Sequence, residues 1–201
     1  MNRVTDENQF LMRDAVLDIL QKYTEARASL RSVLRTYRKE TSYDHDLYSE
    51  IQYLSMGIVQ HLNTIDFLIS RSLRKGSFKN LPHHLLNMIR IALFQAKWQG
   101  ISTTQILSSI KYAEINPILK EALTRNLPDL ISHLPKSQQL SLSHSHPSFI
   151  VETLLRNMSE TDLISLMNGN NAHGSTYLRV MMDFFIFMFL SHLTQLLNTF
   201  H

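Results

Sequence analysis

The stretch "LLNMIRIALFQAKW", residues 85 to 98, is the most apolar helical segment before the C-terminal tail. Its apolar side chains cover most sides of the helix that it would form, and such a helix usually lies at the centre of a bundle. We therefore expect it to be the core helix. Because a guanidinium is seldom buried without a partner, we also expect Arg90 to pair with an acid between Asp44 and Asp66 in a structural role.

The rest of the chain is also predicted to be helical. Five glycines and five prolines in 201 residues leave long stretches without helix breakers. Apolar residues recur at spacings of three and four in residues 6 to 23, 30 to 37 and 46 to 61, and the pattern continues to residue 73 as an extension or a fourth helix. The sequence thus predicts an all-α fold.

Proline, glycine and capping residues mark where the predicted helices around the core helix begin and end. Pro82 is placed to begin that helix, since its missing N–H needs no partner there, and Gly100 is placed to end it. The cluster at residues 102 to 104 is expected to cap a sixth helix through residue 113, and Asn116 with Pro117 to open a seventh. Residues 1 to 134 are therefore predicted to form one bundle of about seven helices.

The remaining residues divide into a linker, a short helical region and a tail. Residues 135 to 146 are polar and rich in serine, which predicts a linker. Two short helices are expected at 147 to 157 and 160 to 167, the second capped by Ser159, and "STYLRV" at 175 to 180 is typical of a strand. Within the apolar tail, 181 to 201, the uncharged run from Phe184 to Phe200 has seventeen residues and is polar in its second half. Because a membrane span needs about 20 predominantly apolar residues, we expect a core or interface helix there.

Basic residues gather in two groups. Four arginines at spacings of four, four and three form one stripe on a helix, and a second group surrounds Gly76 at a helix end. Guanidinium forks bind phosphate well, so both groups predict contacts with an RNA backbone. The alternatives are solvated helix faces with intrahelical partners and, for the second group, cations that suit the helix dipole. The candidate RNA-binding residues are Arg27, Arg31, Arg35, Arg38, Lys39, Arg71, Arg74, Lys75 and Lys79.

Several chemistries are excluded or disfavoured. The chain has no cysteine, which excludes disulfides, thiolate metal sites and cysteine nucleophiles. Adjacent His83 and His84 would point apart on a helix, and His144 and His146 have no carboxylate nearby, so no metal site is predicted. No catalytic motif or phosphate-binding glycine loop is present. The polar, acidic N-terminus is unlike a signal peptide, which places the protein in the cytoplasm.

Three segments resemble the last three helices of the NusB-like RNA-binding domain. Residues 85 to 98 are similar to that family's "LRIALYEL" helix, and residues 101 to 114 and 118 to 125 follow in the family's order. The third segment departs from the family's "FVNAVLR" pattern, with Lys120 in place of its asparagine and Thr124 in place of one arginine. This resemblance implies a NusB-like bundle that binds RNA.

A longer resemblance, over residues 8 to 180, is to the N-terminal part of the RsmB/Fmu branch of RNA cytosine-5 methyltransferases. There a NusB-like domain precedes a linking domain with an HP-x-aromatic helix and an "LR-V/I-N" strand, which implies that residues 147 to 180 begin that domain. The likeness ends at Met181. The residues that match these two motifs are His146, Pro147, Phe149, Leu178, Arg179 and Val180.

This resemblance implies the RNA-binding module of a methyltransferase, truncated before the catalytic domain by a frameshift, early stop or gene split. The family's S-adenosylmethionine pocket and its two catalytic cysteines would then lie elsewhere, and no cofactor is expected in this chain. Without a thiolate, the chain is expected not to be an enzyme as it stands. The implied partners are rRNA or tRNA, with a separately encoded methyltransferase domain as a further possibility, and no membrane.

Three alternatives are open at this point. One is a free-standing transcription antitermination factor of the NusB type, although only Arg3 and Arg13 lie near the arginine cluster with which that protein's first helix begins. Another is a protein-docking module without RNA affinity, which an electrophoretic shift with ribosomal or transfer RNA would separate from an RNA-binding one. The third is a membrane-anchored helical protein, for which solubility without detergent is the test.

Overall fold

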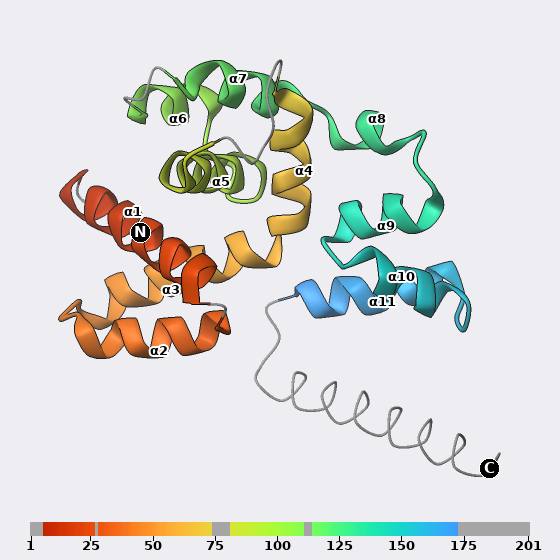
Figure 1. Cartoon of the computed structure of the whole chain (residues 1–201), viewed down its shortest axis with the longest axis horizontal. Coiled ribbons are helices and arrows are strands. Elements are labelled where there is room, and N and C mark those ends of the chain that lie inside the picture. Colours follow the sequence, from red (N-terminus) through yellow and green to blue (C-terminus); the bar gives the residue numbers. More distant parts are fainter. Residues whose placement is uncertain (1–5, 27, 74–80, 111–113, 173–201) are drawn as a thin grey trace, which may run out of the picture. The chain divides into compact units, whose positions relative to one another are not determined.

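The computed structural model describes residues 6–26, 28–73, 81–110 and 114–172. These ranges contain eleven helices and no strand, which confirms the all-α prediction for the described part (Figure 1). The chain divides into two compact units, Met1–Thr153 and Leu154–His201. The helices are α1 (Asp6–Ala26), α2 (Leu30–Glu40), α3 (His45–Gln60), α4 (Leu62–Ser72), α5 (His83–Lys97), α6 (Thr103–Ser109), α7 (Asn116–Thr124), α8 (Leu127–Ile131), α9 (Lys136–His144), α10 (Ser148–Leu155) and α11 (Glu160–Asn171).

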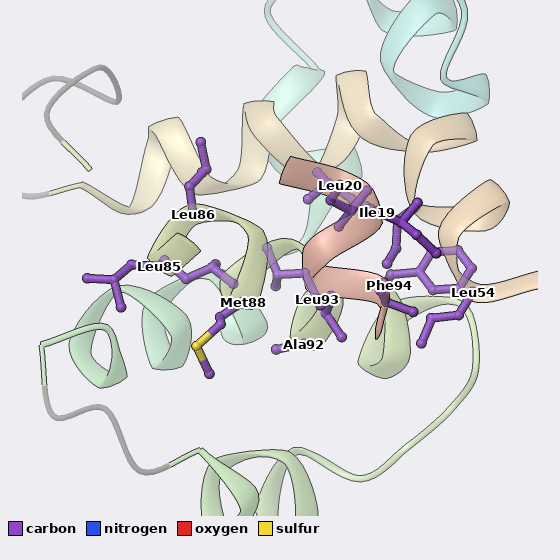
Figure 2. Close-up of a cluster of buried hydrophobic side chains, with 14 of the residues drawn as sticks. Ile19, Leu20, Leu54, Leu85, Leu86, Met88, Ala92, Leu93 and Phe94 are labelled. Carbon is purple, nitrogen blue, oxygen red and sulfur yellow. The ribbon is translucent and has the colours of Figure 1, made fainter. Parts of the chain in front are cut away.

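Helix α5 is the centre of the first unit, as its apolar sequence predicted. It packs against α1, α3, α4, α6 and α7. Ile89 and Leu93 are completely buried, and Phe94 is 3% exposed. Figure 2 shows α5 side chains gathered with Ile19 from α1 and Leu54 from α3. Burial of apolar area on all these sides supplies the main stabilisation of the bundle.

Polar side chains define where several helices begin. Ser102 Oγ accepts the amide of Gln105 at 3.2 Å at the start of α6, and Ser159 caps α11, both as predicted. Asp44 Oδ1 accepts the amide of Leu47 at 2.8 Å at the start of α3. Each cap satisfies an amide that has no partner within its helix. The sixth helix ends at Ser109 instead of continuing to residue 113.

A glycine allows α3 and α5 to approach closely. Gly57 is buried on α3 and faces the ring of Phe94, and a Cβ at this position would lie 3.0 Å or less from three ring atoms. Any side chain there would require the Phe94 ring to move. Gly57 therefore sets the distance between these helices at the end that carries the aromatic residues described below.

The polar segment at 135 to 146 is helical, contrary to the expected linker. It forms α9, in which Leu140, Ser141 and Leu142 are buried. Thr64 on α4 donates to the carbonyl of Leu142 at 2.5 Å and lies 2.6 Å from Ser145 Oγ. These contacts satisfy buried polar groups of α9, and no periodicity within the segment reveals partners about eighty residues away. The expected domain boundaries at residues 134, 146 and 180 stay predictions.

Two other expectations concern the C-terminal part. The strand predicted at 175 to 180 and the tail from residue 181 lie outside the described residues. The helix predicted at 160 to 167 is confirmed and is longer than expected, since α11 continues to Asn171. Among the helices of the described ranges, none has the length and apolar character needed to cross a bilayer.

Candidate nucleic-acid interface

Helix α2 separates an apolar side from a basic side. Val33, Leu34 and Tyr37 are buried against the bundle. Arg31, Arg35 and Lys39 are exposed and follow one another at spacings of four residues. With a rise of about 1.5 Å per residue, their Cα atoms are about 6 Å apart along the helix axis. We call these three residues the α2 stripe.

Contacts with α1 and α3 hold α2 in place. The hydroxyl of Tyr48 donates to the carbonyl of Leu34 at 2.7 Å. Lys22 on α1 reaches Glu40 Oε2 at 3.2 Å and Asp18 Oδ2 at 3.3 Å, and its Nζ lies 5.0 Å from the centroid of the Tyr37 ring. The hydrogen bond to Glu40 is the main reason that the pKa of Lys22 is raised. The α2 stripe is thus displayed on a helix with fixed neighbours.

Burial also affects the tyrosines beneath the α2 stripe. Desolvation raises the pKa of Tyr37 well above its usual value, and contact with Tyr43 raises it further. The pKa of Tyr48 is raised by burial and lowered by the nearby charge of Arg38. Both phenols are therefore neutral around pH 7, and the positive surface charge of α2 comes from its arginines and lysine.

Arg38 differs from the rest of the predicted group. Its Nη1 donates to the carbonyl of Tyr43 at 3.0 Å, and its guanidinium carbon lies 4.4 Å from the centroid of the Tyr48 ring. Both contacts bind Arg38 to the segment between α2 and α3 and to α3 itself. This side chain has an intramolecular role in the structure, which spacing along α2 did not reveal.

The α2 stripe also differs from most other cations of the described ranges. In these ranges no hydrogen bond or ion pair joins Arg31, Arg35 or Lys39 to another residue. By contrast, Arg13 donates to the carbonyl of Ser109, Lys97 to those of Leu123 and Arg125, and Arg125 pairs with Glu121. Three adjacent cations without partners repel one another and favour the approach of an anion.

Arg90 has the acidic partner that the sequence predicted. Its Nε and Nη2 donate to the two carboxylate oxygens of Asp66 at 2.8 and 2.7 Å, and its Nη1 donates to Asn87 Oδ1 at 2.9 Å. The side chains of Arg90 and Asp66 are 11% and 28% exposed. The pair joins α4 to α5, so its role is structural.

The second predicted basic group is described only at Arg71. This residue is exposed in the last turn of α4, and its guanidinium carbon lies 5.1 Å from the centroid of the Phe67 ring. Arg74, Lys75 and Lys79 lie outside the described residues, as does Arg27 of the first group. Their participation in an RNA-binding surface stays a prediction.

The structure also brings together an aromatic group that the sequence analysis did not identify. His61, between α3 and α4, stacks on Trp98 at the end of α5 with ring centroids 4.5 Å apart. Phe94 lies 5.8 Å from Trp98 and 5.9 Å from His61. We call these three residues the aromatic triad. The four-residue spacing of Phe94 and Trp98 is a visible signal, whereas the position of His61 depends on how α3 crosses α5.

Metal ligation receives no support from the described residues. Within them, no three His, Asp or Glu side chains are grouped in a way that could hold an ion. His83 and His84 are both exposed at the start of α5, and His146 Nδ1 lies 2.6 Å from the carbonyl oxygen of His144.

Comparison with known proteins supports the all-α fold of residues 11–110. Residues 11–110 match the NusB family, and these residues form a domain of that family. Such a domain indicates an RNA-binding or antitermination-type role, with RNA or protein partners. The match ends before the HP-x-F and "YLRV" segments on which the methyltransferase resemblance rests. No curated protein and no solved structure matches the chain.

Proposed function

We propose that this chain, whose residues 11–110 form a NusB family domain, binds RNA through the α2 stripe. The observation that carries the proposal is the exposure of Arg31, Arg35 and Lys39 on one side of α2 without an acidic partner in the described ranges. The planar forks of the two arginines suit phosphate oxygens, and Lys39 adds a third positive charge.

The finer proposal is that the RNA is rRNA or tRNA and that this chain presents it to a cytosine-5 methyltransferase domain in the cytoplasm. The HP-x-F and "YLRV" segments support this reading, because they follow the bundle in the order found in the RsmB/Fmu family. Methyl transfer to the 5 position of cytosine needs a thiolate that adds to the ring. Since these 201 residues contain no cysteine, the catalytic residues must come from outside them.

The test removes the charge of the α2 stripe and measures the salt dependence of binding. Arg31→Gln/Arg35→Gln is compared with the wild-type chain in electrophoretic shifts with tRNA and with rRNA fragments between 50 and 200 mM salt. Each lost contact with a phosphate of a single strand lowers the magnitude of the negative slope of log K against log salt by about 0.7. We therefore expect that magnitude to decrease by about 1.4, with weaker binding at every salt concentration.

A matched control separates local contacts from net charge. Lys120 and Arg156 are exposed cations on α7 and beyond α10, and Lys120→Gln/Arg156→Gln removes the same charge. We expect this variant to keep the wild-type slope within about 0.3. Equal losses in both double variants would refute the assignment to α2. Absence of RNA binding by the wild-type chain would refute the function and favour a protein-docking module.

A further inference from the structure

We propose that the aromatic triad is a stacking platform for an unpaired base of the RNA strand that the α2 stripe holds. The inference deepens the proposed function and rests on it, since it names single-stranded RNA as the ligand. Sequence-specific and single-strand RNA recognition commonly uses bases that leave the duplex and stack on aromatic side chains.

The backbone around Trp98 is held in place. The amides of Trp98 and Gln99 both donate to the carbonyl of Phe94, at 3.0 and 3.3 Å. Gly100 then adopts φ +71°, and the amide of Ile101 donates to the carbonyl of Gln95 at 3.0 Å. A left-handed glycine at this place turns the chain back over the last turn of α5. Trp98 therefore loses little backbone freedom when a base stacks on it.

Phe94 and His61 both pack against the ring of Trp98. The planes of Phe94 and Trp98 differ by 14°, and those of His61 and Trp98 by 25°. His61 is itself fixed, because its Nδ1 lies 3.2 Å from Ser145 Oγ. Phe94 is buried, whereas Trp98 is 36% exposed. The planes of His61 and Phe94 differ by 31°, and the three centroids lie 4.5 to 5.9 Å from one another, so the rings form a compact cluster. Trp98 is its most exposed member, and another flat ring can pack on the exposed part of the indole.

The charge around the aromatic triad suits a polyanion. Neither residues 51–65 nor residues 67–113 contain an Asp or Glu, so the segments that carry the triad add no carboxylate beside it. Lys97, Gln99 and Gly100, the neighbours of Trp98 in the chain, are exposed. An apolar peptide would need a wider apolar surface than one indole among polar neighbours, whereas a nucleobase needs only a ring-sized face.

The distance to the α2 stripe gives the length of RNA required. Helices α2 and α3 are joined by a four-residue turn, after which α3 runs back along α2 (Figure 1). The hydroxyl of Tyr48 on α3 donates to the carbonyl of Leu34 on α2. We take the hydrogen-bonded pair Leu34 and Tyr48 as the reference and count three residues along each helix. This places Arg31 opposite Ile51, which lies ten residues before His61. That separation is about 15 Å along α3, which about four or five nucleotides cover at 3.4 Å per step of a strand.

The experiment uses Trp98 as its own reporter, since the chain contains one tryptophan. The full chain is titrated with a ten-nucleotide single-stranded oligoadenylate while tryptophan emission is recorded. We expect saturable quenching that parallels binding. Trp98→Ala should weaken binding about 5- to 150-fold, Trp98→Phe should retain most of it, and inorganic polyphosphate, which has no bases, should bind without quenching.

Phe149→Ala is the matched aromatic control, because Phe149 is 69% exposed on α10 and is not a member of the triad, so its removal should leave binding unchanged. The stacking platform would be overturned if the oligoadenylate binds through the α2 stripe without quenching Trp98 and if Trp98→Ala binds it as tightly as the wild-type chain. That result would leave the proposed function intact. Equal quenching by polyphosphate would also overturn it. No binding of any RNA would remove the proposed function itself. If Trp98→Ala lowers the helix content of the chain, the quenching of the wild-type chain and the affinity of Trp98→Phe still test the platform.

Discussion

Replacing Asp66 with asparagine tests whether the charge of Arg90 needs its carboxylate partner. In the native structure the guanidinium donates to both carboxylate oxygens, at 2.8 and 2.7 Å. Asparagine has nearly the same shape but carries no charge and offers one acceptor in place of two. The Asp66→Asn variant therefore leaves a guanidinium that is 11% exposed with a neutral partner and one lost hydrogen bond.

The loss in free energy of unfolding that we expect for Asp66→Asn lies between two limits. Exposed ion pairs contribute about 0 to 1 kcal/mol, while breaking a fully buried pair by removing one partner costs about 3 to 5 kcal/mol. Since Asp66 is 28% exposed, water can partly solvate the site. We expect a loss of about 2 kcal/mol, which corresponds to a decrease in Tm of about 4 to 8 °C for a chain of this size.

Thermal and urea denaturation followed by circular dichroism measure this effect in the full chain. Arg90→Met should cost less than Asp66→Asn, because the carboxylate that remains is the more exposed partner and can be hydrated. The double variant should therefore be more stable than the sum of the single losses predicts, by about 1 to 2 kcal/mol.

Glu121→Gln is the matched control, since Glu121 pairs with Arg125 at 2.7 Å across one turn and their side chains are 33% and 39% exposed, respectively. Its expected cost is about 0.5 kcal/mol or less. If Asp66→Asn costs no more than this control, burial of the Arg90 guanidinium does not require a carboxylate, and the reasoning is wrong.

Two further predictions concern the packing of α3 and α2. Helix propensity alone would make Gly57→Ala more stable by about 1 kcal/mol, but the new Cβ overlaps the Phe94 ring. We therefore expect urea denaturation to show a net loss of about 1 to 2 kcal/mol in the free energy of unfolding. A gain in stability would contradict the close approach of α3 and α5. Burial raises the pKa of Tyr37, so its neutral form contributes stability below the unfolded pKa of about 10 that is lost as the pH rises above it. Tyr37→Phe should therefore flatten the decline in stability between pH 9 and 11, and an unchanged decline would exclude Tyr37 as its source.

The sequence by itself determined the features that depend on near neighbours. The apolar residues of 85 to 98 identified the central helix, because a helix that is apolar on most sides is stable only when other helices surround it. Ser102 and Ser159 marked helix starts through hydrogen bonds to amides three residues away. The four-residue spacing of Arg31 and Arg35 placed both on one side of α2, since helix geometry alone fixes that relation.

Tertiary structure determined everything that depends on partners distant in the chain. The pairing of Arg90 with Asp66, of all the acids available, follows from how α4 lies on α5. The same is true of α9, whose polar groups find partners on α4. His61 meets Trp98 only because Gly57 lets two helices cross closely. Spacing along a helix specifies which side a residue occupies, but the packing of separate helices specifies what lies opposite it.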